Sequence, residues 1–220
     1  GPIDFTTLNT GGITTFEWTN DNTAIGLSDS GTESIPEFAG VNEGDVPINA
    51  TIEVTPNFEE NGITCSGDPI HFIITINPEA QVNEIDDLVY NDGDLVQIPF
   101  SSSNSGGTTT YEWTSTDPST GMESSGVGNI EFIATNTGNS PIVTTVTVIP
   151  SFENGGISNS GNPETFTVTV NPVPQVELIQ NINICAGDDI NDINFSTLNI
   201  GGTTTYEWTN DNTAIGLAAN

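Results

Sequence analysis

The chain has 220 residues, of which 30 are Asp or Glu and none is Lys or Arg, for a formal net charge of −30 at pH 7. Nucleic acids and anionic membranes are excluded as partners, because both are recognised largely through Lys and Arg. The lack of Lys also excludes Schiff-base chemistry, phosphate binding by Lys and Lys–Asn isopeptide cross-links.

Composition favours an all-β protein. A hydrophobic fraction of 34% suffices for small cores, and 23 Gly with 13 Pro suit a fold rich in turns. No stretch shows the periodicity of a long amphipathic helix. No apolar run is long enough to span a membrane, and no signal peptide is visible. We expect an all-β fold that does not insert into membranes.

One motif occurs three times along the chain. Gly-Gly, three further residues, an aromatic residue and Glu-Trp-Thr occupy residues 11–19, 106–114 and 201–209. The tryptophans of the motif, Trp18, Trp113 and Trp208, are the only three in the chain and lie 95 residues apart. A fixed period of this size predicts tandem modules of about 95 residues.

The middle copy illustrates the strands expected in each module. Ile98 and Phe100 alternate on one strand, and after the Gly-Gly turn Tyr111 and Trp113 share one face of the next. Further strands are predicted at residues 130–133, 142–149 and 165–170, and at residues 48–55 and 71–76 of the first copy. Asn-Pro at residues 77–78 and 171–172 ends the last strand, because Pro cannot donate to a ladder.

These strands predict Ig-like β-sandwiches in an elongated tandem array. About seven short strands in 95 residues, with Trp on the third, are typical of that fold. New first strands are expected at residues 82–90 and 176–185. Residues 1–78 then form a repeat that lacks its first strand, 79–172 a complete repeat and 173–220 the N-terminal half of a third. Such a half, with three strands, would expose its core face.

Two cysteines occupy positions that differ between the copies. By the spacing, Cys65 corresponds to Asn159 and Cys185 corresponds to Tyr90, so the middle module has lost both cysteines together. Paired loss favours a disulfide within a module over one between neighbouring modules. The partners of Cys65 and Cys185 would then lie outside the chain. A bridge closing about 70 residues implies an oxidising, extracellular setting.

A family resemblance extends over essentially the whole chain. It is carried by the strings GGTTTYEWTNDNTAIGL, P-x-x-x-T-x-x-V-x-P, G-x-P-x-T-F-T-V-T-V-N-P and C-x-G. They resemble the PKD-like repeats of very large Bacteroidetes surface proteins, above all the SprB-type gliding adhesins exported by type IX secretion. The usual W-D-F-G-D-G motif of PKD domains is not present. The resemblance implies β-sandwich repeats in a cell-surface filament used in gliding motility and adhesion.

Two patterns could be mistaken for sites. An exposed Trp beside acidic residues could bind carbohydrate, but recurrence at a structural period favours Trp113 and Tyr111 as core residues. Glu112 and its counterparts recur once per module and cannot form an acid–base pair. His71 alternates away from Phe72 and Ile74 and is expected to face solvent. We expect no catalytic site.

Acidic loops are the candidate binding sites. The run at residues 91–94 contains Asp92 and Asp94, and its counterpart by the 95-residue spacing is 186–189, with Asp188, Asp189 and nearby Asp192. Calcium prefers such carboxylate and carbonyl oxygens. No spacing matches an EF-hand loop, and Asx-rich runs also form ordinary turns. Calcium is therefore the one cofactor that the sequence suggests.

The function expected is a non-catalytic stalk or filament segment of a bacterial cell-surface adhesin. Its partners would be an extracellular surface or polysaccharide and the neighbouring repeats. Two alternatives stay open at this point: a glycan- or surface-binding module, and a spacer region of a secreted enzyme.

Overall fold

The computed structural model describes residues 1–217 and is all-β, as predicted. Within these residues, regular secondary structure consists of β-strands and three-residue 3-10 helices. The chain divides into two compact units. The first contains residues 1–83, 100–112 and 149–163, and the second contains residues 84–99, 113–148 and Glu164 onward. Strands β8 (Thr108–Ser115) and β11 (Ile142–Asn154) contribute residues to both.

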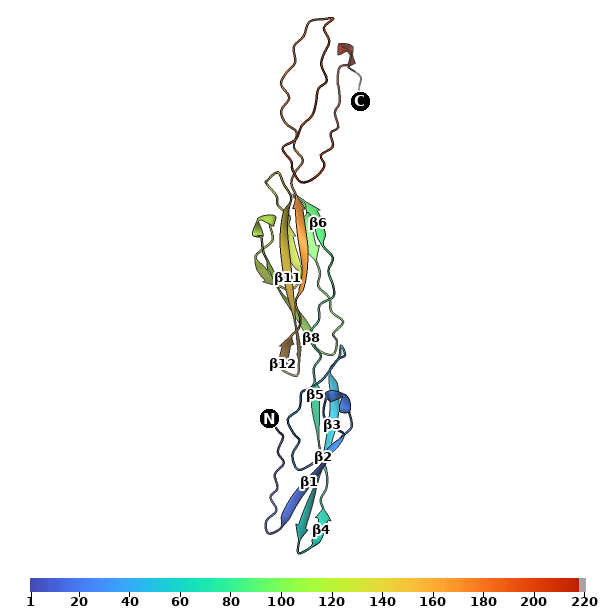
Figure 1. Ribbon diagram of the computed structural model, residues 1–220, viewed down its shortest axis with the longest axis vertical. Coiled ribbons are helices and arrows are strands. Elements are labelled where there is room, and N and C mark those ends of the chain that lie inside the picture. Colours follow the sequence, from blue (N-terminus) through green and yellow to red (C-terminus); the bar gives the residue numbers. More distant parts are fainter. Residues whose placement is uncertain (218–220) are drawn as a thin grey trace. The chain divides into compact units, whose positions relative to one another are not determined.

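A five-stranded sheet organises the first unit (Figure 1). Its strands are β1 (Ile13–Asn20), β2 (Ser30–Thr32), β3 (Ile48–Glu60), β4 (Ile63–Ser66) and β5 (Ile70–Ile76). The order is β2-β1-β3, and the other edge of β3 pairs first with β5 and then with β4. A 3-10 helix, η1 (Thr23–Ile25), joins β1 to β2. The core beneath this sheet includes Trp18, Ile35 and Ile52, all buried.

β3 is longer than predicted, because Pro56 does not end it. Residues Ile48–Val54 pair with β5 and Asn57–Glu60 pair with β4, so Pro56 lies between the two registers. The N–H and C=O of one strand residue point to the same side. The Pro56 carbonyl accepts from Gly67 N–H at 2.8 Å, and its missing donor therefore faces the break between β4 and β5. Pro150 is placed in the same way in β11, opposite Gly161.

A second, six-stranded sheet has the order β6-β13-β11-β8-β9, with β12 also paired to β11. Its remaining strands are β6 (Leu88–Asn91), β9 (Ser125–Val127), β12 (Ile157–Ser160) and β13 (Glu164–Asn171). Two further strands, β7 (Leu95–Ile98) and β10 (Ile130–Ile133), form a separate ladder. A 3-10 helix, η2, spans Pro118–Thr120. Of the first strand expected at residues 82–90, only the end is formed, as part of β6.

The predicted core positions of these strands are buried. Trp18 is 2% and Trp113 is 8% exposed, which confirms that both belong to the core. Tyr111 is half-buried, and its ring lies 5.5 Å from that of Phe100. Both ladders of the second unit contribute buried apolar residues, among them Val96, Ile98, Ile130, Val146, Val148, Phe166, Val168 and Val170.

Residues 173–217 differ from the prediction. The three strands expected there are not formed in the described residues, which contain only the 3-10 helix η3 (Thr213–Ile215) (Figure 1). Among the described residues this segment pairs with no counterpart of β11 or β13, and its backbone joins no ladder. Most of its apolar side chains are exposed, with Leu178 at 87% and Ile200 at 60%. The module boundaries at 78/79 and 172/173 stay predictions.

Candidate functional site

The first predicted calcium-binding run forms a tight turn between β6 and β7. The Asp94 carboxylate accepts the N–H of Asn91 at 2.8 Å, and Asp94 N–H donates to the Asn91 carbonyl at 3.1 Å. Gly93 has a φ of +90°, which favours glycine. The Asp92 carboxylate accepts the N–H of Asn136 at 2.6 Å. Both carboxylates therefore stabilise the turn and the loop beside it.

The second run forms the same turn one residue earlier than the 95-residue spacing predicts. The Asp188 carboxylate accepts the N–H of Cys185 at 3.1 Å, and Gly187 has a φ of +97°. The counterpart of Asp94 is thus Asp188, not Asp189, and the counterpart of Asn91 is Cys185. The alignment of Cys185 with Tyr90 was wrong, because the glycine with positive φ fixes the register of the turn.

No described group of three or more His, Cys, Asp and Glu side chains is arranged to hold a metal ion. Asp189 and Asp192 are exposed. Three carboxylates, those of Asp92, Asp94 and Asp188, accept hydrogen bonds from backbone N–H groups in local turns. Asx residues favour such turns without any metal. Calcium binding by these residues stays a prediction.

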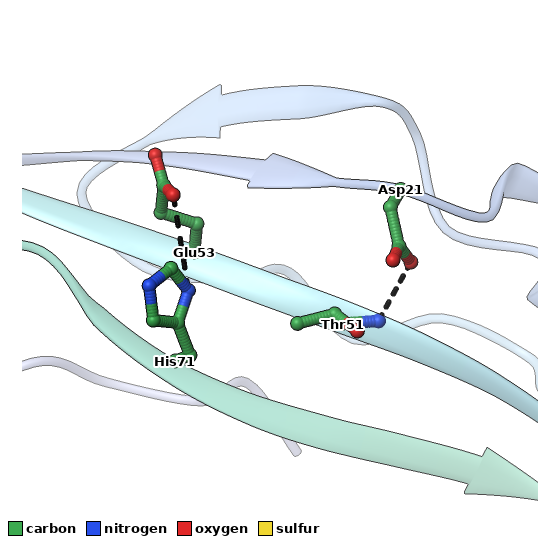
Figure 2. Close-up of polar contacts among 4 residues, drawn as sticks. All are labelled: Asp21, Thr51, Glu53 and His71. Carbon is green, nitrogen blue, oxygen red and sulfur yellow. Dashed lines mark hydrogen bonds and ion pairs between the residues drawn. The ribbon is translucent and has the colours of Figure 1, made fainter.

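The one histidine lies on the exposed side of β5, as predicted. His71 Nδ1 is 3.8 Å from Glu53 Oε2 on the neighbouring strand β3, and the side chains are 55% and 47% exposed (Figure 2). Close by, Asp21 accepts the N–H of Thr51 at 2.7 Å, which ties the loop after β1 to β3 (Figure 2). An exposed pair at this distance contributes little to stability.

The Glu-Trp-Thr motif does not form an exposed aromatic platform in the first two copies, where Trp18 and Trp113 are buried. In the third copy Trp208 is half-buried. The indole N–H groups of Trp18 and Trp113 have no described acceptor. The glutamates that precede the three tryptophans are exposed.

Both thiols are free and exposed in the described chain. Cys65 lies in β4 opposite Phe58, and its counterpart Asn159 lies in β12 opposite Phe152. Cys185 lies in the acidic turn. The two predicted bridge positions of the middle copy, Tyr90 and Asn159, fall in different compact units. Disulfides to partners outside the chain stay a prediction.

Asn104 organises a hydrogen-bonded junction within the first unit. Its Nδ2 donates to the Glu79 carbonyl at 3.0 Å, and its Oδ1 accepts the N–H of Gln81 at 2.7 Å. The Ser102 hydroxyl accepts the Asn104 N–H at 3.0 Å. Beside it, Ser105 N–H donates to the Asp45 carbonyl at 2.9 Å. We call this group of contacts the first joint.

Asn199 makes the same set of contacts within the second unit. Its Nδ2 donates to the Val173 carbonyl at 3.1 Å, and its Oδ1 accepts the N–H of Gln175 at 2.6 Å. The Thr197 hydroxyl accepts the Asn199 N–H at 3.0 Å. Ile200 N–H donates to the Asn139 carbonyl at 2.8 Å. We call this group of contacts the second joint.

Side-chain amides add further contacts at the first joint. Asn77 and Asn154 bond to each other, since Asn154 Nδ2 donates to Asn77 Oδ1 at 2.9 Å and Asn77 Nδ2 donates to the Asn154 carbonyl at 3.2 Å. Asn159 Nδ2 donates to the Pro78 carbonyl at 3.1 Å. Pro78 is buried. The residues after β5 are thus held by partners far along the chain.

Sequence reasoning missed Asn104 and Asn199 as junction residues. The signal was present, because Ser or Thr, any residue, Asn, any residue and Gly-Gly occur before all three tryptophan motifs. In the first copy Asn9 N–H donates to Thr7 Oγ1 at 3.0 Å, as at the two joints. Asn side chains that bond to backbone groups are typical of turns, so the motif by itself indicates a loop and not a junction.

Two carboxylates have a lowered pKa. The pKa of Asp87 is lowered chiefly because its carboxylate accepts the N–H of Thr167 in β13, at 2.7 Å. The pKa of Asp117 is lowered by its hydrogen bonds to Ser119 at the start of η2. Both groups therefore act as structural acceptors at the ends of elements.

No protein-family model matches the chain, and no curated protein matches it. In the part of the chain that the structure describes, no helix has the length and apolar character needed to cross a membrane.

Proposed function

We propose that the chain is a non-catalytic stalk segment of a secreted or surface-attached bacterial adhesin, in which Ig-like repeats hold adhesive parts at a fixed separation. The observation that carries this proposal is the repetition of one set of hydrogen bonds at the two joints. Asn104 and Asn199 bond to the same backbone positions of the preceding segment in both places.

A stalk needs junctions that resist bending, and flexible linkers do not provide this. At each joint the preceding segment contributes three groups that are hydrogen-bonded to the Asn side chain or to the adjacent backbone. Pro47 also lies against Gly106, and Pro141 lies against Gly201, so that an added Cβ would come within 2.9 and 3.1 Å of the respective proline Cδ atoms. Repeated close contacts of this kind favour one junction geometry over many.

Charge supports the same function. With 30 acidic residues and no Lys or Arg, successive segments repel one another and the chain resists aggregation. The resemblance to the repeats of gliding adhesins agrees with an extracellular setting and with type IX secretion. The burial of Trp18 and Trp113 disfavours the alternative of a glycan-binding platform on the tryptophan motif.

Distance measurement between spin labels tests the fixed junction. Labels at Glu43→Cys and Ser158→Cys, in a Cys65→Ser and Cys185→Ser background, report on the first unit. We expect a narrow distance distribution that Asn104→Ala broadens. Asn199→Ala is the matched control, because it removes the same side chain from the second joint and leaves the first intact. A broad distribution in the chain with Asn104 present would contradict the proposal.

Binding assays with the full chain test its non-adhesive character. We expect no saturable binding on a glycan array or to insoluble polysaccharides at near-physiological salt. Specific, saturable binding that competes with free sugar would replace the stalk by a glycan-binding module.

A further inference from the structure

Strands β13 and β5 occupy equivalent places in the two larger sheets but differ at their outer edges. β13 pairs in parallel with β6, with Val168 opposite Leu88 and Asn171 opposite Asn91. Among the described residues, β5 pairs with β3 alone. The pair Thr51–Ile73 corresponds to Thr145–Thr167 in register.

The open edge of β5 presents unpaired backbone donors. In β13 the N–H of Thr167 points away from β11 and donates to Asp87 at 2.7 Å. By the same register, Ile73 N–H and Thr75 N–H point to the open edge of β5. An edge of this kind is a template for an additional strand.

The C-terminal segment contains the equivalent of β6 outside any sheet. The two acidic turns place Cys185 at the position of Asn91, so that Ile182–Cys185 corresponds to Leu88–Asn91. Leu88 and Tyr90 are half-buried. Their counterparts Ile182 and Ile184 are 51% and 49% exposed.

These two segments also carry little charge. Residues 178–187 contain no charged side chain, and β5 contains no carboxylate. The acidic residues that flank β6, Asp87 and Asp92, are replaced by Asn181 and Ala186 around the unpaired segment. In a chain with a net charge of −30, two copies approach with least repulsion where neither carries a carboxylate.

We propose that residues Ile182–Cys185 of one copy pair in parallel with the outer edge of β5 in a second copy. The register copies that of β13 with β6, so Ile74 faces Ile182, Ile76 faces Ile184 and Asn77 faces Cys185. The two surfaces differ, so the contact is heterologous and can continue head to tail. The proposal is independent of the stalk function.

Disulfide trapping tests the register. In β13 and β6, Asn171 Nδ2 donates to Asn91 Oδ1 at 3.4 Å, so the side chains at this position meet. Asn77→Cys in a Cys65→Ser background therefore places a thiol opposite Cys185 of the second copy, with Cα atoms about 4.8 Å apart. We expect covalent dimers and higher species on mild oxidation.

Thr75→Cys in the same background is the matched control. It lies two residues away on the same edge, about 8 Å from Cys185, beyond the span of a disulfide. Cross-linking of Asn77→Cys well above that of Thr75→Cys supports the register. Equal cross-linking of both variants, or none of either, would overturn it.

Sedimentation of the unmodified chain tests the association itself. We expect reversible self-association that strengthens with added NaCl, because salt screens the repulsion between copies. Ile184→Asp should weaken it by about tenfold or more, because the variant buries a charge at the contact. Ile215→Asp, at another exposed isoleucine of the C-terminal segment, should leave it unchanged. A monomer at all salt concentrations, or equal loss in both variants, contradicts the proposal.

Discussion

The ring of Phe152 lies directly against Gly107, so that a Cβ added at Gly107 would come within 2.4 Å of Phe152 Cζ and 2.5 Å of the Glu153 carbonyl oxygen. Phe152 is fully buried in β11. The second glycine of the Gly-Gly turn is therefore required because the ring of Phe152 occupies the place of a side chain.

Gly107→Ala should destabilise the chain by about 1–3 kcal/mol, the usual cost of overpacking a core. Urea denaturation followed by circular dichroism measures this. The matched control is Gly202→Ala, at the equivalent position of the third motif, where no atom lies within 4 Å of an added Cβ. Similar losses of stability in the two variants would show that backbone conformation, not the contact with Phe152, is the reason why position 107 requires glycine.

The three tryptophans should differ in their contribution to stability. Trp113→Ala removes a buried indole and should lower the free energy of unfolding by about 3–5 kcal/mol. Trp208→Ala should have little effect, because Trp208 is only half-buried and its segment belongs to no sheet. Acrylamide quenching of single-tryptophan variants should likewise be strongest for Trp208. Equal quenching of all three indoles would argue that the third motif is packed like the others.

Asp117 should be replaceable by Asn but not by Ala. Its carboxylate accepts the N–H of Ser119 at 2.9 Å at the start of η2, and Asn22 makes the same contact with Ala24 at the start of η1. Asp117→Ala should lower the midpoint of thermal unfolding, because the start of η2 loses its N-cap. Asp117→Asn should stay close to the unmodified chain in thermal unfolding. A loss as large as that of the Ala variant would mean that the charge matters.

Acid should remove the contribution of Asp87 to stability. Its folded-state pKa is lowered from 3.8, so the contribution is fully present above that value and disappears as pH falls through the folded pKa. Asp87→Ala should therefore be less stable than the unmodified chain at neutral pH, and the difference should shrink below about pH 3.8. Thermal unfolding at a series of pH values measures both. A difference that stays constant into acid would contradict the role of the carboxylate.

Salt should raise Tm, because the charge of −30 destabilises the compact state through self-repulsion. Calorimetry with NaCl and with CaCl2 at equal ionic strength also tests the predicted calcium sites. A greater increase with CaCl2, lost in Asp94→Asn, would support specific binding. Equal increases would refute it.

Much of the fold could be predicted because period-two alternation reports directly on which side of a strand is buried. It placed Trp113 and the strands around residues 130–133 and 165–170 correctly. It placed strand ends less well at Pro56 and Pro150, because whether a proline interrupts a ladder depends on which neighbour its missing N–H faces. The sequence of β3 alone does not predict that this strand pairs with two successive strands, β5 and β4, along the same edge.

The candidate junction residues also combine features that the sequence predicts with features that depend on the fold. The charge, the 95-residue period of the tryptophans and the alternation that buries two of them can be read from the sequence, because they depend on residue type and local spacing. That Asn104 and Asn199 join segments about 25 residues apart is visible only in the folded chain, since a side-chain amide bonds to whichever backbone the fold brings near it. The folded chain also shows that residues 173–217 form no strands, because a strand requires a partner and the sequence of one strand does not say whether that strand is paired.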